Sequence, residues 1–76
     1  MKDFNEMAIE YLKIDAAAIA DHLTPQDVPA WDSMNYLLFI SELEKEYGVS
    51  FTMDEVLNAQ SLGDVRAALR SKGADV

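Results

Sequence analysis

The segment from Asp32 to Tyr47 carries the start and stop signals of one long helix. Asp32 belongs to the residue types that cap helix N-termini, and Gly48 stands where a glycine commonly ends a helix. Apolar residues recur between these signals at helical intervals, at Tyr36, Ile40, Leu43 and Tyr47, with Leu37 bordering them. The pattern predicts a helix with one buried face, and the rest of the chain must supply the elements that cover this face.

Two further helices are predicted at the ends of the chain. Asp3 caps a first helix that reaches about Leu12, and Glu6 stands at the position that completes a capping box. Ser61 caps a last helix that ends at Gly73. We expect the last helix to bury Leu62, Val65, Ala68 and Leu69, and to complement its negative C-terminal end with Arg66, Arg70 and Lys72.

The middle of the chain is less regular. Residues 14–32 contain two prolines and isolated apolar anchors, which predicts a long loop that wraps the core. Thr52 and Glu55 form the capping box of a short helix, and we expect this helix to contribute Val56 and Leu57 to the core. No segment alternates with period two for long. The predicted fold is therefore all-α: a four-helix bundle with three main helices, a short third helix and a long first loop.

Size and composition limit the possible functions. The 76 residues are expected to form one domain, residues 1–76, and a chain of this size buries only about 60% of its unfolded surface. The core is therefore too thin for a large internal active site. The absence of cysteine excludes disulfides and thiolate metal sites and fits a reducing compartment, so we expect a cytoplasmic protein. The longest apolar run, Tyr36 to Ile40, is too short to span a membrane.

Acidic residues dominate the charge of the chain. The formal net charge is −8, and between residues 14 and 64 ten acidic residues accompany a single base, Lys45. This surface would repel nucleic acid, and it would attract proteins that carry basic patches. The same acids could instead serve only to keep a small domain soluble.

The long helix also has a second apolar stripe. At 100° per residue, one stripe of this helix contains Met34, Leu38, Ser41 and Lys45. This stripe lies more than about 100° away from the centre of the predicted core face. Two large apolar residues on one exposed stripe indicate a docking surface. Alternatively, the preceding loop covers them, since Trp31 is large enough to do so.

No catalytic or metal-binding pattern is present around the single histidine, His22, or around any serine. Ser33 instead follows Asp32 at the start of the long helix, where its hydroxyl would be accessible to another enzyme. Helix N-termini also tolerate phosphate, because free N–H groups point toward it. On local physics alone, capping is the favoured explanation of both residues.

The wider pattern resembles the acyl carrier protein family. The residues that carry the resemblance are Trp31-Asp32-Ser33-Met34, the helix through Glu42-Leu43-Glu44-Lys45-Glu46-Tyr47-Gly48, and then Phe51, Asp54-Glu55 and Ser61-Leu62. The resemblance extends from about Phe4 to Ser71. It implies a four-helix bundle without catalytic or metal sites of its own. A phosphopantetheinyl transferase would attach 4′-phosphopantetheine to Ser33, and the arm would carry acyl groups as thioesters.

The resemblance also implies site residues and partners. Asp32 would help to position metal and phosphate during attachment of the arm. Enzymes that load or transfer the acyl group would dock their basic and apolar patches on the second helix, and we expect a monomeric carrier. The expected partner-binding residues are Met34, Leu38, Ser41, Glu42, Glu44 and Lys45.

Several positions depart from the fatty acid carriers. Ala30 replaces a common glycine, Trp31 precedes the aspartate, Leu38 stands at a position that is usually acidic, and Ser41 replaces an exposed methionine. The Trp-Asp-Ser triplet resembles stand-alone carriers outside the main fatty acid pathway, including D-alanyl carriers and specialised biosynthetic carriers. The resemblance to the family as a whole implies a role in fatty acid or polyketide biosynthesis. The chain is thus expected to carry acyl or aminoacyl groups. The alternative is a non-carrier acidic helical module that binds a protein partner directly.

Overall fold

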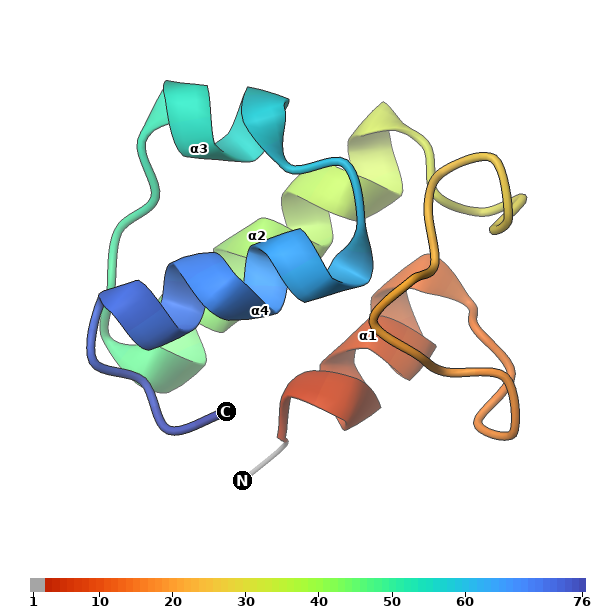
Figure 1. The fold of residues 1–76 in the computed structure, drawn as a ribbon, viewed down its shortest axis with the longest axis horizontal. Helices are drawn as coiled ribbons and strands as arrows, with labels where there is room; N and C mark the ends of the chain where they lie inside the picture. The colour runs from red at the N-terminus through yellow and green to blue at the C-terminus, as the bar shows by residue number, and fades with distance from the viewer. Residues whose placement is uncertain (1–2) are drawn as a thin grey trace.

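The computed structural model describes residues 3–76, which form four α-helices and contain no β-strand. They are α1 (Phe4–Leu12), α2 (Ser33–Tyr47), α3 (Met53–Asn58) and α4 (Leu62–Ser71). In the view of Figure 1, α1 and α3 lie on opposite sides of the α2–α4 pair. The predicted all-α architecture, with a short third helix and a long first loop, is confirmed.

The helix starts follow from local capping. Asp3 accepts a hydrogen bond from the Glu6 amide at 2.8 Å, and Ser61 accepts one from the Asp64 amide at 3.2 Å. At α3 the capping box with Thr52 is complete in both directions. Each side chain satisfies amides that have no partner within their own helix. The predicted N-caps are therefore confirmed.

The α2 helix ends at Gly48, as predicted. Its φ of 64° lies in the left-handed region, which glycine adopts without a steric penalty. The Gly48 amide donates to the carbonyl of Glu44 and so satisfies one of the last carbonyls of the helix.

One apolar cluster connects all four helices and the first loop. From the loop, Ile14, Leu23, Val28 and Trp31 are buried, which confirms that residues 14–32 wrap the core. The helices contribute Phe4, Met7, Ala8, Leu12, Phe39, Ile40, Leu43, Val56, Leu62, Val65 and Leu69. A loop held by several buried apolar anchors can keep one conformation although it has almost no regular structure.

The buried face of α2 differs from the predicted one. Phe39 is fully buried and its ring meets that of Phe4 edge-on, with the centroids 5.5 Å apart. Leu37, which was predicted to border the core, is 54% exposed. The cause is the packing of α1 on the Phe39 side of α2, which turns the buried sector away from Leu37. The prediction for Leu57 was also wrong: it is 72% exposed, and α3 buries only Val56.

The first loop also closes the start of α4. The Leu62 amide donates to the carbonyl of Leu23 at 2.9 Å, and the Gly63 amide donates to the carbonyl of Asp21 at 2.8 Å. These bonds satisfy two helix-start amides with loop carbonyls. A Cβ atom at position 63 would lie only 3.0 Å from the Asp21 Cβ, so the close approach depends on glycine.

Arg66 of α4 and the C-cap residue Lys72 make contacts beyond those predicted. The guanidinium of Arg66 binds Asp21 at 2.9 Å and Asn5 at 2.6 Å, and it lies over the Phe4 ring. Lys72 binds Glu55. These side chains cross-link separate segments of the fold, whereas we expected them only to complement the end of their own helix.

Candidate functional site

Ser33 is the first residue of α2, and its side chain is exposed. The cap of this helix is the carboxylate of Asp32, whose Oδ1 accepts the Asn35 amide at 2.8 Å. The Asn35 side chain in turn donates to the carbonyl of Ala30 at 2.9 Å, which fixes the turn before the helix. Among residues 3–76, no side chain or backbone group hydrogen-bonds the Ser33 hydroxyl. Capping therefore explains Asp32 and leaves the Ser33 hydroxyl available for chemistry.

The position of Ser33 suits a phosphate ester. The first amides of α2 point out of the helix start, and the helix dipole places partial positive charge there. The Asp32 carboxylate is also negative and already accepts the Asn35 amide at this helix start. Repulsion between the like charges would therefore direct a phosphate on Ser33 away from Asp32, toward solvent. Both residues are exposed, which makes this arrangement sterically open. The region described by the structure holds no group of three or more acidic or histidine side chains that could bind a metal ion.

Ser33 lies on the rim of a surface hollow of about 230 Å³. The first loop, α2 and α3 form this hollow through Pro25, Trp31, Asp32, Ser33, Tyr36, Val56, Leu57 and Ala59. The buried Trp31 ring packs on Tyr36 with the centroids 5.7 Å apart, and the Tyr36 hydroxyl donates to the Val56 carbonyl at 2.7 Å. Burial, and then the charge of Asp64, raise the pKa of Tyr36, so this hydroxyl keeps the proton that it donates.

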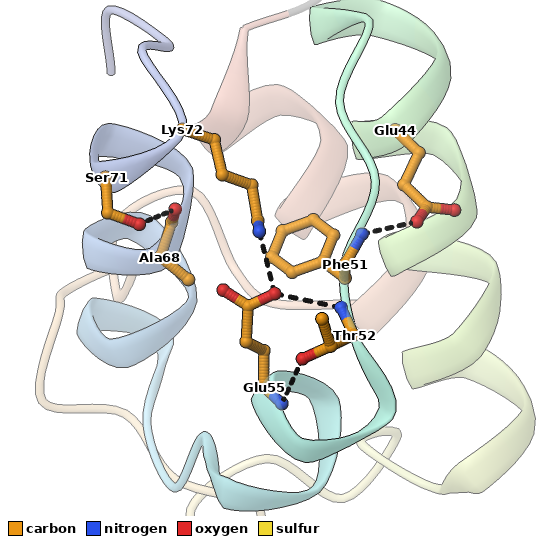
Figure 2. Close-up of polar contacts among 7 residues, drawn as sticks. All are labelled: Glu44, Phe51, Thr52, Glu55, Ala68, Ser71 and Lys72. Carbon is orange, nitrogen blue, oxygen red and sulfur yellow. Dashed lines mark hydrogen bonds and ion pairs between the residues drawn. The ribbon is translucent and has the colours of Figure 1, made fainter.

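A polar cluster holds α3 in place beside the hollow (Figure 2). The Glu55 carboxylate accepts from Lys72 Nζ at 2.7 Å and from the Thr52 amide at 2.9 Å, while Lys72 also lies 5.4 Å from the centre of the Phe51 ring. The hydrogen bond from Lys72, followed by that from the Thr52 amide, lowers the pKa of Glu55. Because α3 is short and buries only Val56, these polar contacts matter for its position.

The predicted partner-binding residues divide into two groups. Met34 is 73% exposed, Leu38 is 49% exposed, and Ser41 is exposed beside them. Because Met34 and Leu38 remain exposed, the first loop with Trp31 does not cover this stripe. Three charged residues make contacts within the chain: Lys45 lies 3.6 Å from Glu42, and Glu44 accepts the Phe51 amide at 2.8 Å (Figure 2).

Three exposed apolar residues of α2 and α3 were not predicted to be exposed. Leu37 was placed at the border of the core and Leu57 in the core, and Met53, which is 67% exposed, was not considered. Met53 and Leu57 are four residues apart on α3, so they share one face of that helix. This spacing was a detectable signal of an outward apolar face.

In Figure 1, an extended segment leads from the end of α2 to α3. The hollow is lined by residues from the start of α2, from the end of α3 and from the first loop. The structure describes no helix that is both long and apolar enough to cross a bilayer within residues 3–76.

Comparison with known proteins agrees with this geometry. The family described as "phosphopantetheine attachment site" matches residues 5–69. Among solved structures, a Mycobacterium tuberculosis protein described as an acyl carrier protein superposes with a TM-score of 0.80 at 23% sequence identity. The match covers 91% of this chain and 92% of that one, and it shows a shared fold. A comparison with curated proteins gave no match.

The family match spans most of the chain, including the whole of α2 and the exposed serine at its start. Members of such a family do not catalyse a reaction of their own; their chemistry resides in a covalently attached 4′-phosphopantetheine. The chain therefore belongs to the phosphopantetheine attachment site family and is a carrier protein of the acyl carrier type.

Proposed function

We propose that Ser33 is the attachment point of the phosphopantetheine arm and that the chain presents acyl or aminoacyl thioesters to partner enzymes. The observation that supports Ser33 most directly is the division of roles at the start of α2. Asp32 makes the capping hydrogen bond, while the exposed Ser33 hydroxyl makes none within residues 3–76. A transferase can thus react with Ser33 without first breaking the cap of the helix.

Attachment would form one phosphodiester bond. The Ser33 oxygen binds the phosphorus that carries pantetheine, the pyrophosphate bond of coenzyme A breaks, and adenosine bisphosphate leaves. The hydroxyl proton passes to a base on the phosphopantetheinyl transferase. The arm ends in a thiol, which supplies the sulfur nucleophile that this cysteine-free chain lacks.

The proposed docking surface surrounds Ser33 and is more apolar than the sequence analysis expected. It keeps the predicted residues Met34, Leu38, Ser41, Glu42, Glu44 and Lys45, and it adds Leu37, Met53 and Leu57. Glu44 already binds the Phe51 amide, so the apolar residues are the better candidates for direct contact. The remaining acids would act mainly at long range, by attracting a basic partner.

The specialised pathway remains part of the proposal. Leu38 is exposed at a position where fatty acid carriers usually have an acid, and Trp31 packs at the base of the hollow. These features support partners different from those of the common fatty acid carrier. The proposed protein is a cytoplasmic, monomeric carrier that serves an acyl- or aminoacyl-loading ligase, and the absence of cysteine fits a reducing compartment.

Intact mass spectrometry tests the attachment. Incubation with coenzyme A and a broad-specificity phosphopantetheinyl transferase should add the mass of one phosphopantetheine to the wild-type chain. Ser33→Ala should abolish the gain, whereas Ser50→Ala, which changes an exposed serine outside the proposed docking surface, should preserve it. An unmodified wild-type chain would refute the proposal and favour the non-carrier interaction module.

A further inference from the structure

A second hollow adjoins the one beside Ser33. It has a volume of about 390 Å³ and is lined by Thr24, Pro25, Gln26, Ala59 and Gln60. Pro25 and Ala59 line both hollows. The two hollows therefore lie next to each other, between the first loop and the segment that follows α3, and only the nearer one includes Ser33. We treat them together as one groove that runs from Ser33. We call this the Ser33 groove.

The chemistry of the Ser33 groove changes along its length. Near Ser33 the walls are mainly apolar, with Trp31, Val56 and Leu57. At the far end stand Gln26 and Gln60, which are the only glutamines in the chain. Both are exposed, and neither side-chain amide has a hydrogen-bond partner among residues 3–76.

A phosphopantetheine arm has the same order of groups. The phosphate is followed by a dimethyl-substituted carbon, then by two amides, and finally by the thiol. An arm that starts at Ser33 and follows the groove would place its dimethyl group beside the apolar wall. Its amides would reach Gln26 and Gln60, whose side chains can each donate and accept hydrogen bonds.

We propose that the phosphopantetheine arm rests in the Ser33 groove, with its amides bound by Gln26 and Gln60. The inference rests on the proposed attachment at Ser33 and adds the place where the arm lies between encounters with partner enzymes. A partner would then have to lift the arm from the groove before it could reach the thioester.

The walls of the groove are fixed before any arm arrives. Asp27 accepts hydrogen bonds from both the amide and the hydroxyl of Thr24, at 3.2 and 3.1 Å. The Leu62 amide holds the Leu23 carbonyl next to this turn. On the other side, the Tyr36 hydroxyl holds the Val56 carbonyl. A site that is already ordered loses little conformational entropy when the arm binds.

Nuclear magnetic resonance can locate the arm in the modified protein. In ¹⁵N-labelled protein, attachment of the arm should shift the side-chain amide signals of Gln26 and Gln60 and the indole signal of Trp31. The side-chain amide of Asn5, which binds Arg66 away from the groove, should not move. Shifts confined to residues next to Ser33 would mean that the arm extends into solvent and would overturn the inference. Shifts of the buried Leu43 would place the arm inside the bundle and would also overturn it.

Thiol reactivity gives a second test, because the arm carries the only thiol of a chain without cysteine. In the modified protein, Gln26→Ala with Gln60→Ala should raise the alkylation rate of the thiol about two- to fivefold, since the arm would leave the groove more often. These substitutions do not change the charge near the thiol. Asn58→Ala removes an exposed amide that does not line the groove and should leave the rate unchanged. Equal rates in all three proteins would refute the resting site.

A variant that blocks the groove provides a third test of the resting site. Ala59→Leu would place a larger side chain where the two hollows join, and it should abolish the shifts of Gln26 and Gln60. Circular dichroism would confirm that the variant folds. Mass spectrometry of every sample distinguishes a failure of attachment at Ser33 from a failure of the arm to rest in the groove. A chain that gains no arm contradicts attachment at Ser33, whereas a modified chain with an unperturbed groove contradicts only the resting site.

Discussion

Lys72 and Glu55 join the end of α4 to the first turn of α3, with 2.7 Å between Nζ and Oε1. Their side chains are only 19% and 29% exposed, and the same carboxylate oxygen accepts the Thr52 amide (Figure 2). The ion pair therefore supports the capping box of α3. It stabilises the helix that forms one wall of the Ser33 groove.

The first prediction concerns the pH dependence of this contact. The pKa of Glu55 is lower in the folded chain than its ordinary value of 4.5, because Lys72 and Thr52 donate hydrogen bonds to the carboxylate. A lowered folded-state pKa stabilises the fold above the unfolded pKa, and this contribution is lost as the pH falls through the folded pKa. Glu55→Gln should therefore lower the thermal midpoint at neutral pH. The difference from wild type should disappear well below pH 4.5.

Thermal unfolding followed by circular dichroism at several pH values measures this effect. Glu42→Gln is the matched control, since Glu42 pairs at 3.6 Å with a lysine that is 73% exposed. Such surface pairs contribute little to stability. A difference between Glu55→Gln and wild type that stays constant down to acid pH would contradict the prediction.

The second prediction concerns the hydrogen bond between α2 and α3. Tyr36→Phe removes the hydroxyl that donates to the Val56 carbonyl at 2.7 Å, and it should lower the free energy of unfolding by about 1 kcal/mol. The pKa of Tyr36 is raised in the folded chain, so its contribution is present below pH 10 and is lost as the pH rises through the folded pKa. Denaturant titration at neutral and alkaline pH would show this, and an equally stable variant at neutral pH would contradict it.

The third prediction compares two neighbouring residues of α2. Phe39→Ala should destabilise the fold by about 3–5 kcal/mol, because it leaves a cavity against Phe4. Leu37→Ala should change the free energy of unfolding by less than about 0.5 kcal/mol, since Leu37 is 54% exposed. Chemical denaturation of both variants provides the measurement. Similar losses from both would show that the buried face of α2 is centred elsewhere.

The fourth prediction distinguishes long-range electrostatic attraction of a partner from direct apolar contact at the docking surface. With a phosphopantetheinyl transferase as partner, added salt should slow association, because it screens the net charge of −8. Leu38→Gln should lower the efficiency of modification about tenfold at every salt concentration, since it removes apolar contact. Glu42→Gln should have a smaller effect that fades with salt.

Modification rates measured at low and high salt distinguish the electrostatic contribution from the apolar one. An association rate that is independent of salt would mean that the acids serve only solubility. A Leu38→Gln variant that is modified as fast as wild type would remove Leu38 from the docking surface.

Much of this protein follows from short-range sequence signals. The caps at Asp3, Asp32, Thr52 and Ser61 act over three residues, so the sequence predicts where each helix begins. The end of α2 is also predicted by a local signal, because Gly48 ends the helix through its own positive φ angle. The serine after Asp32, with the spacing of the helices behind it, was enough to indicate the family.

Only the tertiary structure decided which side chains are buried and what the charged ones contact. Helical periodicity gives a face but not its exact centre, and the packing of α1 moved that centre from the Leu37 side toward Phe39. Residues distant in the sequence, such as Pro25 and Ala59, meet only because the loop closes on α4. Local hydrogen bonds fix the helices one at a time, whereas the burial of Phe39 and the Ser33 groove depend on how those helices and the loop pack together.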